Sequence, residues 1–503
     1  MLSLESRAVN CRHCNKIFCL FCLFYTIFKF SFTCFPRMFM LLLKKITGDI
    51  YMDNIAADRT NEAKIIKQNA KLLDLLRFYK DIDKSELSRR LQVSLPTVYK
   101  SIDDLTTIGI INKSDSTFSI NNNYGILVGI SIGSSLCKVV FLNLDFQRFT
   151  SDKFDIHKKG LCKNIASHLS NTKLLQQCLE DCSRNYIYFD TPSCFSELKN
   201  ILNDIFDYIQ SCILNHEFHV LSIGISCTGI INDRTQSIMS AHNLHYLDAK
   251  LLATLIFPDK QQFFQNYGIH LSLVQNSNAS LIAEKVHLCL TNSNYQDKEN
   301  IISLYFGKGW GAGFYFNKLY TGIHGYAGEI GHIKAPCYES NVDILEYNNR
   351  LAHPEKYDYN VDDCCTCGNN DCYDFKIRSY CFNCSAKDFQ NFSSDEIRDY
   401  LASNPPKAQL LGKYLGNMIN TLTNLLNVEL IVFTGKIYKS MELLNNYIEI
   451  ERDENPIIYS RTDCTTITSS YGSLAPSIGA AIYAYHTKYD LELSWSTNPT
   501  ILK

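Results

Sequence analysis

One polar junction does most to limit how this chain can fold. Residues 271–274 form an apolar run that predicts a buried strand, and residues 276–279 (Asn-Ser-Asn-Ala) are suited to begin a helix directly after it. Short polar side chains cap helices because they accept hydrogen bonds from backbone N–H groups that lack a partner. An ordinary helix cap explains this tetrapeptide when it is taken alone, so a functional interpretation depends on the segments around it.

The size, charge and cysteine content of the chain set its broad class. Its 503 residues have room for roughly two to four domains. The net charge of −2 does not by itself indicate a nucleic-acid-binding protein. The 21 cysteines lack the regular spacing of a disulfide framework, so we expect a protein of the reducing cytoplasm with one or two metal-type cysteine clusters.

The first 51 residues differ in composition from the rest, and we treat 1–51 as a doubtful N-terminal extension. Residues 17–43 are rich in Phe, Cys and Leu, and no small-residue cleavage site follows them, so a signal peptide is not expected. Three explanations stay open: a stretch upstream of a true translation start at Met52, a membrane helix, or a zinc knuckle. A membrane is expected as a partner only if this extension belongs to the protein.

Residues 52–121 have the pattern of a winged helix-turn-helix DNA-binding domain. Apolar residues recur at helical spacing through 63–78, Asp83 begins a short second helix with a capping box to Glu86, and Ser94 caps a third helix. An apolar hairpin can follow as the wing. A short helix, a tight turn and a third helix with a polar face form the motif that enters the major groove of DNA.

The polar face of this segment supplies the predicted DNA contacts. We expect some of these residues to lie at base edges and others, with Lys113, on the phosphate backbone. The alternative is a small helical protein–protein module, because Asp103 and Asp104 dilute the positive charge. The predicted DNA-binding residues are Arg89, Arg90, Ser94, Thr97, Tyr99 and Lys100.

Glycine turns between apolar strands characterise the remainder of the chain. Residues 125–144 alternate apolar side chains on both sides of Gly133, which predicts two strands and a turn whose amides can receive a phosphate. Residues 307–313 carry alternating glycines that we expect to join strands 301–306 and 314–316. Any hairpin can carry such glycines, so a turn without a ligand stays an alternative.

Residues 325–332, Gly-Tyr-Ala-Gly-Glu-Ile-Gly-His, are the most specific stretch. They resemble the signature Gly-x-x-x-Glu-Ile-Gly-His of the ROK family (repressor, open reading frame, kinase) almost without gaps. The order of residues in 86–111 also resembles the MarR-like winged helix of many ROK repressors. The resemblance runs from about Met52 onward and points to regulators such as the N-acetylglucosamine and xylose repressors. Other segments that resemble family patterns are residues 131–135, 227–232, 276–279, 365–372 and 429–436.

The resemblance implies an α/β fold in which the N-terminal winged helix-turn-helix precedes a two-lobed, actin-like ATPase (ribonuclease H-like) sugar-kinase body at 122–503. We expect the first lobe to contain about 122–243 together with a C-terminal helix within 475–503. The second lobe, which carries the metal, is then expected at about 244–474.

The resemblance also implies a sugar-binding cleft. Glu329 would accept hydrogen bonds from sugar hydroxyls, because a carboxylate offers two acceptor oxygens. His332 would use one ring nitrogen for the sugar and the other for a metal ion. The predicted sugar-binding residues are Asn243, Asn276, Ser277, Glu329, His332 and Asp374.

A structural zinc ion is the cofactor that the resemblance implies. Residues 365–372 resemble the family pattern Cys-x-Cys-Gly-x-x-Gly-Cys, and with one histidine they complete a tetrahedral site of one imidazole and three thiolates. The predicted ligands are His332, Cys365, Cys367 and Cys372. Cys364, Cys381 and Cys384 are rival ligands, and free buried thiols are the alternative to a metal site.

Phosphoryl transfer is expected to be lost. The ROK kinase patterns have Asp at the positions of Ser131 and Ser277, and the second Asp is the general base on the sugar hydroxyl. A serine hydroxyl is far too weak a base near neutral pH. The residues expected to form a degenerate nucleotide site are Ser131, Gly133, Gly307, Gly309 and Gly435.

Our hypothesis is therefore a sugar-responsive transcriptional regulator, a repressor of carbohydrate-utilisation genes that is not an enzyme. Its expected partners are operator DNA, a small sugar or sugar phosphate, and further copies of itself in a dimer or tetramer. Two alternatives stay open. One is an ATP-dependent sugar kinase, and the other is a regulator that docks a transport-system protein instead of a sugar.

Overall fold

The computed structural model describes residues 61–79, 82–114, 117–149, 161–169, 175–176, 186–215, 219–291, 294–359 and 361–491. The predictions for residues 1–51, and for the beginning of the DNA-binding segment at 52–60, lie outside these ranges. The described residues all belong to one compact unit, Arg59–Lys503. Within them, no helix has both the length and the hydrophobicity that crossing a bilayer requires.

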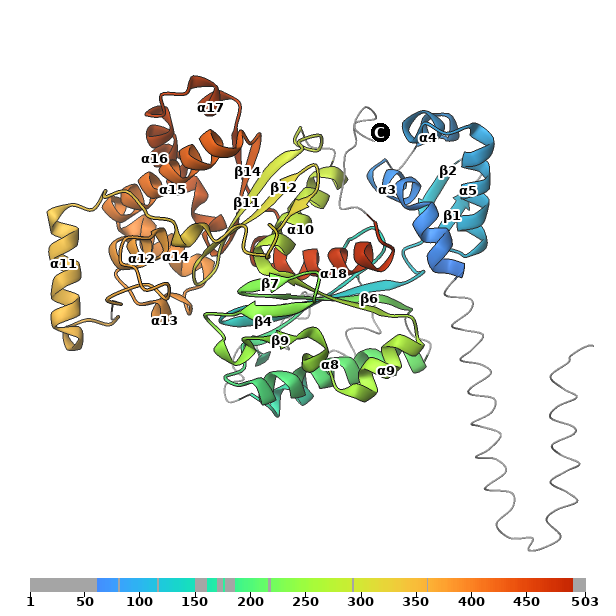
Figure 1. Cartoon of the computed structure of the whole chain (residues 1–503), viewed down its shortest axis with the longest axis horizontal. Coiled ribbons are helices and arrows are strands. Elements are labelled where there is room, and N and C mark those ends of the chain that lie inside the picture. Colours follow the sequence, from blue (N-terminus) through green and yellow to red (C-terminus); the bar gives the residue numbers. More distant parts are fainter. Residues whose placement is uncertain are drawn as a thin grey trace, which may run out of the picture. The chain divides into compact units, whose positions relative to one another are not determined.

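Two five-stranded mixed sheets build the body, as the α/β prediction requires (Figure 1). The first sheet has the order β10 (His270–Gln275), β6 (Val220–Cys227), β3 (Ile126–Ile132), β4 (Leu136–Leu142), β5 (Tyr186–Asp190). The second has the order β13 (Leu319–Tyr320), β12 (Trp310–Phe316), β11 (Asn300–Phe306), β14 (Leu430–Gly435), β15 (Thr465–Thr468). Strands β3, β6 and β14 are buried along their whole length, which explains why their sequences are nearly continuous apolar runs.

Two helices pack against each other between these sheets. Helix α18 (Ala475–Lys488) lies on the first sheet and α10 (Asn276–Leu290) on the second (Figure 1). Their backbones approach closely, since a Cβ at Gly479 would lie 1.7 Å from the carbonyl oxygen of Ala279. Any larger residue at position 479 would therefore push the two helices apart.

The remaining helices surround the sheets or extend from them, and a small third sheet adjoins the first. The longer helices are α8 (Phe195–Leu214), α9 (Pro258–Asn266), α11 (Asn341–Ala352), α14 (Ser394–Ser403), α15 (Pro405–Leu426) and α16 (Met441–Asp453). The short helices are α12 (Tyr373–Lys376), α13 (Ala386–Phe389) and α17 (Ile458–Thr462), and the third sheet is β7 (Ile230–Asn232), β8 (Ser237–Ser240) and β9 (Lys250–Leu251).

The sheet pairing corrects the lobe boundary that we placed between residues 243 and 244. Strand β10 pairs in parallel with β6, from His270 opposite Ser222 to Gln275 opposite Cys227. The connection between them carries β7 to β9 and α9, so residues 244–275 belong with the first sheet. A crossover of this length is what a parallel pair needs, and the pairing of its ends is not visible in local sequence patterns.

The N-terminal elements lie close to their predicted positions. Residues 61–68 are helical, and α3 (Ala70–Phe78), α4 (Lys84–Leu91), α5 (Leu95–Thr107), β1 (Ile111–Ser114) and β2 (Thr117–Ile120) follow. Asp83 caps α4 by accepting from the backbone N–H of Glu86 at 2.8 Å. The predicted capping box is only half formed, because the Glu86 carboxylate turns to Arg89 and Arg90 instead of to the cap.

Candidate functional site

A cleft opens between the two sheets, where the turn after β3, the first residues of α10 and the loop before β12 meet. Its wall contains residues from both lobes and from the glycine-rich segment that matches the family signature. The structure brings together every residue that we predicted to bind a sugar. These lining residues are Asn243, Asn276, Ser277, Glu329, His332 and Asp374.

Two of the cleft-lining residues, Asn276 and Ser277, lie in the first turn of α10. Asn276 Nδ2 donates to the carbonyl oxygen of Ile132 at 3.2 Å, which anchors this side chain over the end of β3. In the described part of the chain, its Oδ1 and the Ser277 hydroxyl are buried and have no hydrogen-bond partner. An unsatisfied buried polar atom costs about 1–3 kcal/mol, so these atoms favour a hydroxyl-rich ligand.

Trp310 was missed in the sequence analysis. Its indole N–H is also buried without a partner among the described residues, and the side chain lines the cleft. The glycine loop is also shorter than predicted, because β12 begins at Trp310 and not at Phe314. A tryptophan between glycines could have indicated a ring stacked on a ligand, since an indole offers an apolar face and one donor.

Glu329 is oriented by a neighbour from the first sheet. Its Oε1 accepts from Gln275 Nε2 at 3.0 Å, and burial is the main reason why the pKa of Glu329 is raised. Gln275 is the last residue of β10 and also lines the cleft. Its position at the carboxyl end of a parallel strand is the signal that could have identified it, because ligands of open α/β sheets bind at this end.

Asp374 explains why glycines occur in the loop and in the signature. Its Oδ1 accepts from the backbone N–H of Trp310 at 2.8 Å, and burial raises its pKa to about 6. A Cβ at Gly309 would lie 2.4 Å from one carboxylate oxygen of Asp374, and a Cβ at Gly331 would lie 2.3 Å from the other. Gly309 is therefore required for packing, whether or not a nucleotide binds.

The other residues of the expected nucleotide site line a second cavity of about 440 Å³ that adjoins the cleft. These are Ser131, Gly133, Gly307 and Gly435. Gly435 has a φ of 77°, and a Cβ there would lie 2.2 Å from the carbonyl oxygen of Phe306. This glycine, too, is explained by the approach of β14 to β11.

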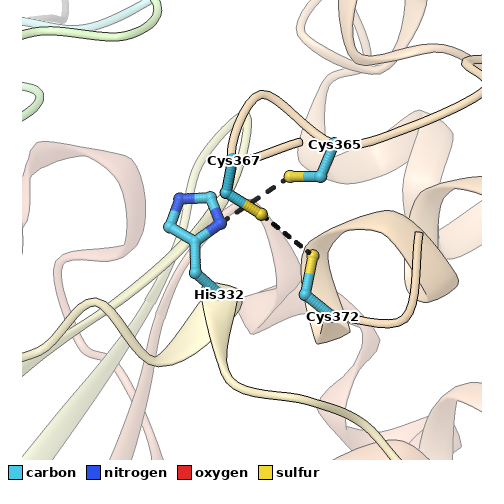
Figure 2. Close-up of side chains that lie close together, drawn as sticks. All are labelled: His332, Cys365, Cys367 and Cys372. Atoms are coloured by element: carbon cyan, nitrogen blue, oxygen red, sulfur yellow. Dashed lines mark hydrogen bonds between the residues drawn. The ribbon is translucent and has the colours of Figure 1, made fainter. Parts of the chain in front are cut away.

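Three thiols and one imidazole converge at the edge of the cleft (Figure 2). His332 Nδ1 lies 3.7 Å from Cys365 Sγ, and Cys367 Sγ lies 3.9 Å from Cys372 Sγ. All four donor atoms lie within 4.8 Å of one another. A tetrahedron with Zn–S bonds of about 2.3 Å has edges of about 3.8 Å, so this donor set fits a zinc ion. The rivals Cys364, Cys381 and Cys384 lie outside the group.

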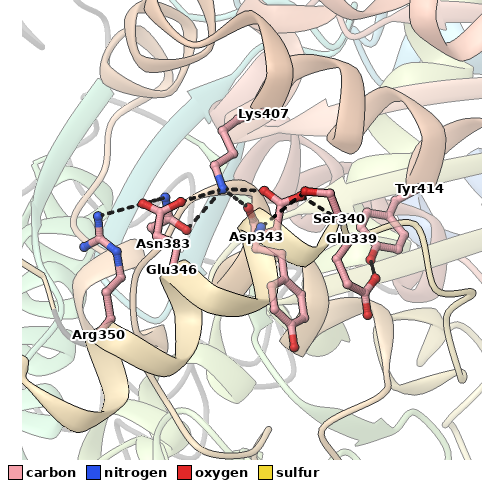
Figure 3. A network of polar contacts seen from close by, with 9 residues as sticks. Glu339, Ser340, Asp343, Glu346, Arg350, Asn383, Lys407 and Tyr414 are labelled. Atoms are coloured by element: carbon pink, nitrogen blue, oxygen red, sulfur yellow. Dashed lines mark hydrogen bonds and ion pairs between the residues drawn. The ribbon is translucent and has the colours of Figure 1, made fainter.

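The segment between His332 and Cys365 is fastened to the second lobe by ion pairs (Figure 3). Lys407 Nζ on α15 lies 2.9 Å from Asp343 Oδ1 and 3.1 Å from Glu346 Oε2, and both carboxylates belong to α11. The same ammonium donates to the carbonyl oxygen of Tyr380 at 2.9 Å. This network holds α11 beside the helices that follow the cysteine loop.

The predicted DNA-binding residues differ in their intramolecular contacts. Thr97, Tyr99 and Lys100 are exposed on α5. Ser94 Oγ accepts from the backbone N–H of Thr97 at 3.4 Å and lies 2.9 Å from Thr97 Oγ1. The two arginines pair with one carboxylate. That pairing joins Arg89 and Arg90 to Glu86 at 2.5 and 2.6 Å.

Comparison with known proteins places this architecture in a family. The ROK family profile matches residues 188–487. The xylose repressors of Bacillus spizizenii and Bacillus subtilis are 24% and 23% identical to this chain over 287 and 291 residues. Each alignment covers 56% of this chain and 65% of the repressor, so this chain spans just under two thirds of the length of these relatives. A crystal structure of a ROK family transcriptional regulator, a homologue of the E. coli Mlc protein, aligns with a TM-score of 0.57 at 18% identity, over 85% of this chain and 97% of that one. The chain therefore belongs to the ROK family and has its actin-like sugar-kinase fold.

Proposed function

We propose that this protein is a sugar-responsive transcriptional regulator that represses carbohydrate-utilisation genes. The observation that carries the proposal is the cluster of buried, unpaired polar atoms in the cleft, Asn276 Oδ1, Ser277 Oγ and Trp310 Nε1. Sugar hydroxyls both donate and accept hydrogen bonds, so they satisfy all three. Because similar proteins are named xylose repressors, xylose is the first sugar to test.

We propose that the cleft binds its sugar without phosphorylating it. Ser277 occupies the position of the expected general base and cannot accept a proton near neutral pH. The two lining carboxylates already accept hydrogen bonds, Glu329 from Gln275 and Asp374 from Trp310. Both are therefore suited to hold sugar hydroxyls in place.

We also propose that His332, Cys365, Cys367 and Cys372 hold a structural zinc ion. When bound, the ion neutralises thiolate charge and keeps His332 in one tautomer and orientation. Because Nδ1 faces the thiols, Nε2 is the ring nitrogen that remains for a ligand in the cleft.

For DNA binding, we propose a winged helix-turn-helix domain at 52–121 and a sugar-binding body at 122–503. The exposed face of α5, with Thr97, Tyr99 and Lys100, would enter the major groove. Two copies related by a two-fold axis would read a palindromic operator. A sugar that binds better to one arrangement of the two lobes would increase the fraction of protein in that arrangement. If the two DNA-binding domains of the dimer are placed differently in that arrangement, the affinity for the operator changes.

Glu329→Gln is expected to weaken sugar binding about 10- to 100-fold. The amide keeps the shape of the side chain but removes a charged acceptor, whose hydrogen bonds contribute about 1.5–3 kcal/mol. Isothermal titration calorimetry with xylose and a panel of hexoses measures the loss. Glu355→Gln is the matched control, because Glu355 is exposed and does not line the cleft. Equal sugar affinity in the two variants would contradict the proposed site.

The same sugar must not be turned over. We expect no ADP release above background when the protein is given Mg-ATP together with the sugar that binds best. A coupled ADP-release assay makes this measurement. Measurable turnover would support the sugar-kinase alternative and overturn the proposal that the cleft binds sugar without phosphorylating it.

Lys100→Ala is expected to weaken operator binding about 3- to 10-fold and to lower the slope of log affinity against log salt by about 1, as the loss of one phosphate contact does. Fluorescence anisotropy with DNA fragments from the protein's own locus measures both quantities. Lys318→Ala removes the same charge from an exposed position next to β13 and is the control. We expect the best-binding sugar to change the affinity of the unmodified protein about 5-fold or more. A protein that binds none of these fragments would overturn the regulator proposal.

A further inference from the structure

Two lysines project into the second cavity, next to the sugar cleft. Lys138 lies on β4 and is only 8% exposed, and Lys436 directly follows β14. Both side chains line the cavity of about 440 Å³. Neither lysine belongs to the residues that we predicted to bind a sugar, a nucleotide or a metal ion.

Neither ammonium group has a carboxylate within ion-pair distance in the described part of the chain. Lys138 Nζ donates to the carbonyl oxygen of Ser473 at 2.7 Å. Lys436 Nζ donates to those of Gln390 at 2.5 Å and Phe389 at 3.4 Å. Burial, followed by repulsion from Lys436, lowers the pKa of Lys138 to about 7. Burial also lowers the pKa of Lys436 to about 8, although the Glu396 carboxylate nearby opposes this shift. Buried charge without a counter-ion is costly, so an anion in this cavity would be strongly favoured.

The surroundings add positive potential. Lys308 lines this cavity as well as the sugar cleft. Two helices also begin at its wall. Ser393 and Ser394 open α14, whose N-terminus is already capped by the carboxylate of its own Glu396, and Pro476 lies in the first turn of α18. The partial positive charge at the N-terminus of α18 therefore favours a bound anion. Asp190 is the one carboxyl among the lining residues, and burial raises its pKa.

The same residues disfavour a metal ion. Ser131 stands at the position where the pattern of the family's kinases has Asp, and strand pairing sets Lys138 directly opposite it. An ammonium group in that position repels a divalent cation instead of attracting it. The cavity therefore has the charge to bind phosphate directly, but not as a metal complex.

We propose that this second cavity binds the phosphate group of a small metabolite without a metal ion, with Lys138 and Lys436 as its counter-ions. The site goes beyond the proposed sugar sensor, because its two lysines do not line the sugar cleft. The cavities nevertheless share Asn276, Gly307 and Lys308 along their walls. Free phosphate, a sugar phosphate or a nucleotide could supply the group, and the experiment distinguishes them.

Calorimetric titration of the full chain with inorganic phosphate, xylose 5-phosphate, glucose 6-phosphate and ATP tests the site, each with and without added magnesium. We expect at least one phosphorylated probe to bind, and magnesium not to strengthen its binding. Lys138→Met and Lys436→Met should each weaken that probe at least tenfold and leave the affinity for unphosphorylated sugar within about twofold. Lys439→Met is the control, because Lys439 pairs with Asp395 and does not line the cavity.

Thermal unfolding provides a second readout that does not depend on how well the variants bind sugar. Without phosphate, Lys138→Met should melt at the same or a higher temperature than the unmodified protein, because a buried uncompensated charge is gone. It should also lose the rise in melting temperature that phosphate causes. The proposal is overturned if no phosphorylated probe binds, if the two variants bind like the control, or if ATP binds only with magnesium. If the protein binds unphosphorylated sugar but no phosphorylated probe, the regulator proposal stands and the phosphate site is overturned. If it binds a phosphorylated probe but no unphosphorylated sugar, only the proposed sugar site is overturned.

Discussion

Arg77→Met is expected to lower the free energy of unfolding by about 3 kcal/mol. This value is the lower end of the range for breaking a buried ion pair, and we choose it because the Asp74 side chain keeps 21% exposure. The guanidinium of Arg77 is buried where α3 meets the body. Its Nε donates to the carbonyl oxygen of Leu144 at 2.6 Å, Nη2 donates to the Tyr485 hydroxyl at 2.9 Å, and Nη1 pairs with Asp74 Oδ1 at 2.5 Å. Methionine fills similar space but leaves these acceptors unpaired.

Urea denaturation followed by far-ultraviolet circular dichroism measures this loss. Lys71→Met on the same helix is the control, because Lys71 is exposed and its replacement should change stability by less than about 0.5 kcal/mol. A loss below about 1 kcal/mol for Arg77→Met would show that the contacts of Arg77 do not stabilise the packing of α3 against the sugar-binding body.

Arg77 also lies on a continuous chain of packed elements between the cleft and the DNA-binding segment. Tyr485 belongs to α18, which packs against α10, and α10 carries Asn276 and Ser277 at the cleft. We therefore expect Arg77→Met to reduce the effect of sugar on operator affinity while the sugar affinity itself stays within about twofold. Two-way titration of sugar and operator DNA measures this coupling.

Cys372→Ser is expected to lower zinc affinity by at least about 100-fold, because a four-ligand structural site loses a thiolate. The Cys372 thiol is fully buried and stands at the start of α12, two residues before Asp374. We expect sugar binding to weaken together with zinc binding, since His332 is then no longer held in one orientation.

Metal content by mass spectrometry, and competition with a zinc-binding dye, measure the first effect, and calorimetry measures the second. Cys464→Ser is the matched control, because Cys464 is another buried thiol of the same lobe that lies outside the metal group. One tightly bound zinc per chain in Cys372→Ser would contradict the ligand assignment and direct attention to Cys364, Cys381 or Cys384.

Local sequence patterns were sufficient to predict the helices and strands around the cleft. The apolar run before Asn276 predicted strand β10, the polar residues after it predicted the start of α10, and the glycine at 133 predicted the turn from β3 to β4. These features depend on residues close together in the chain, so periodicity and capping reveal them. The cleft residues come from distant segments, and only their resemblance to family motifs assembled them before the structure did.

Tertiary structure decided what depends on the approach of distant segments. It placed β10 in the first sheet, which moved the lobe boundary, and it showed that Gly309 and Gly331 make room for the Asp374 carboxylate. It also set Lys138 opposite Ser131 and buried it without a counter-ion, a pairing that no local pattern records. By itself, the sequence determined the elements, the family and the donor types at the cleft. Only the tertiary structure decided which side chains are buried, which charges have a counter-ion and where two backbones approach closely. These properties depend on atoms that folding brings together from segments hundreds of residues apart.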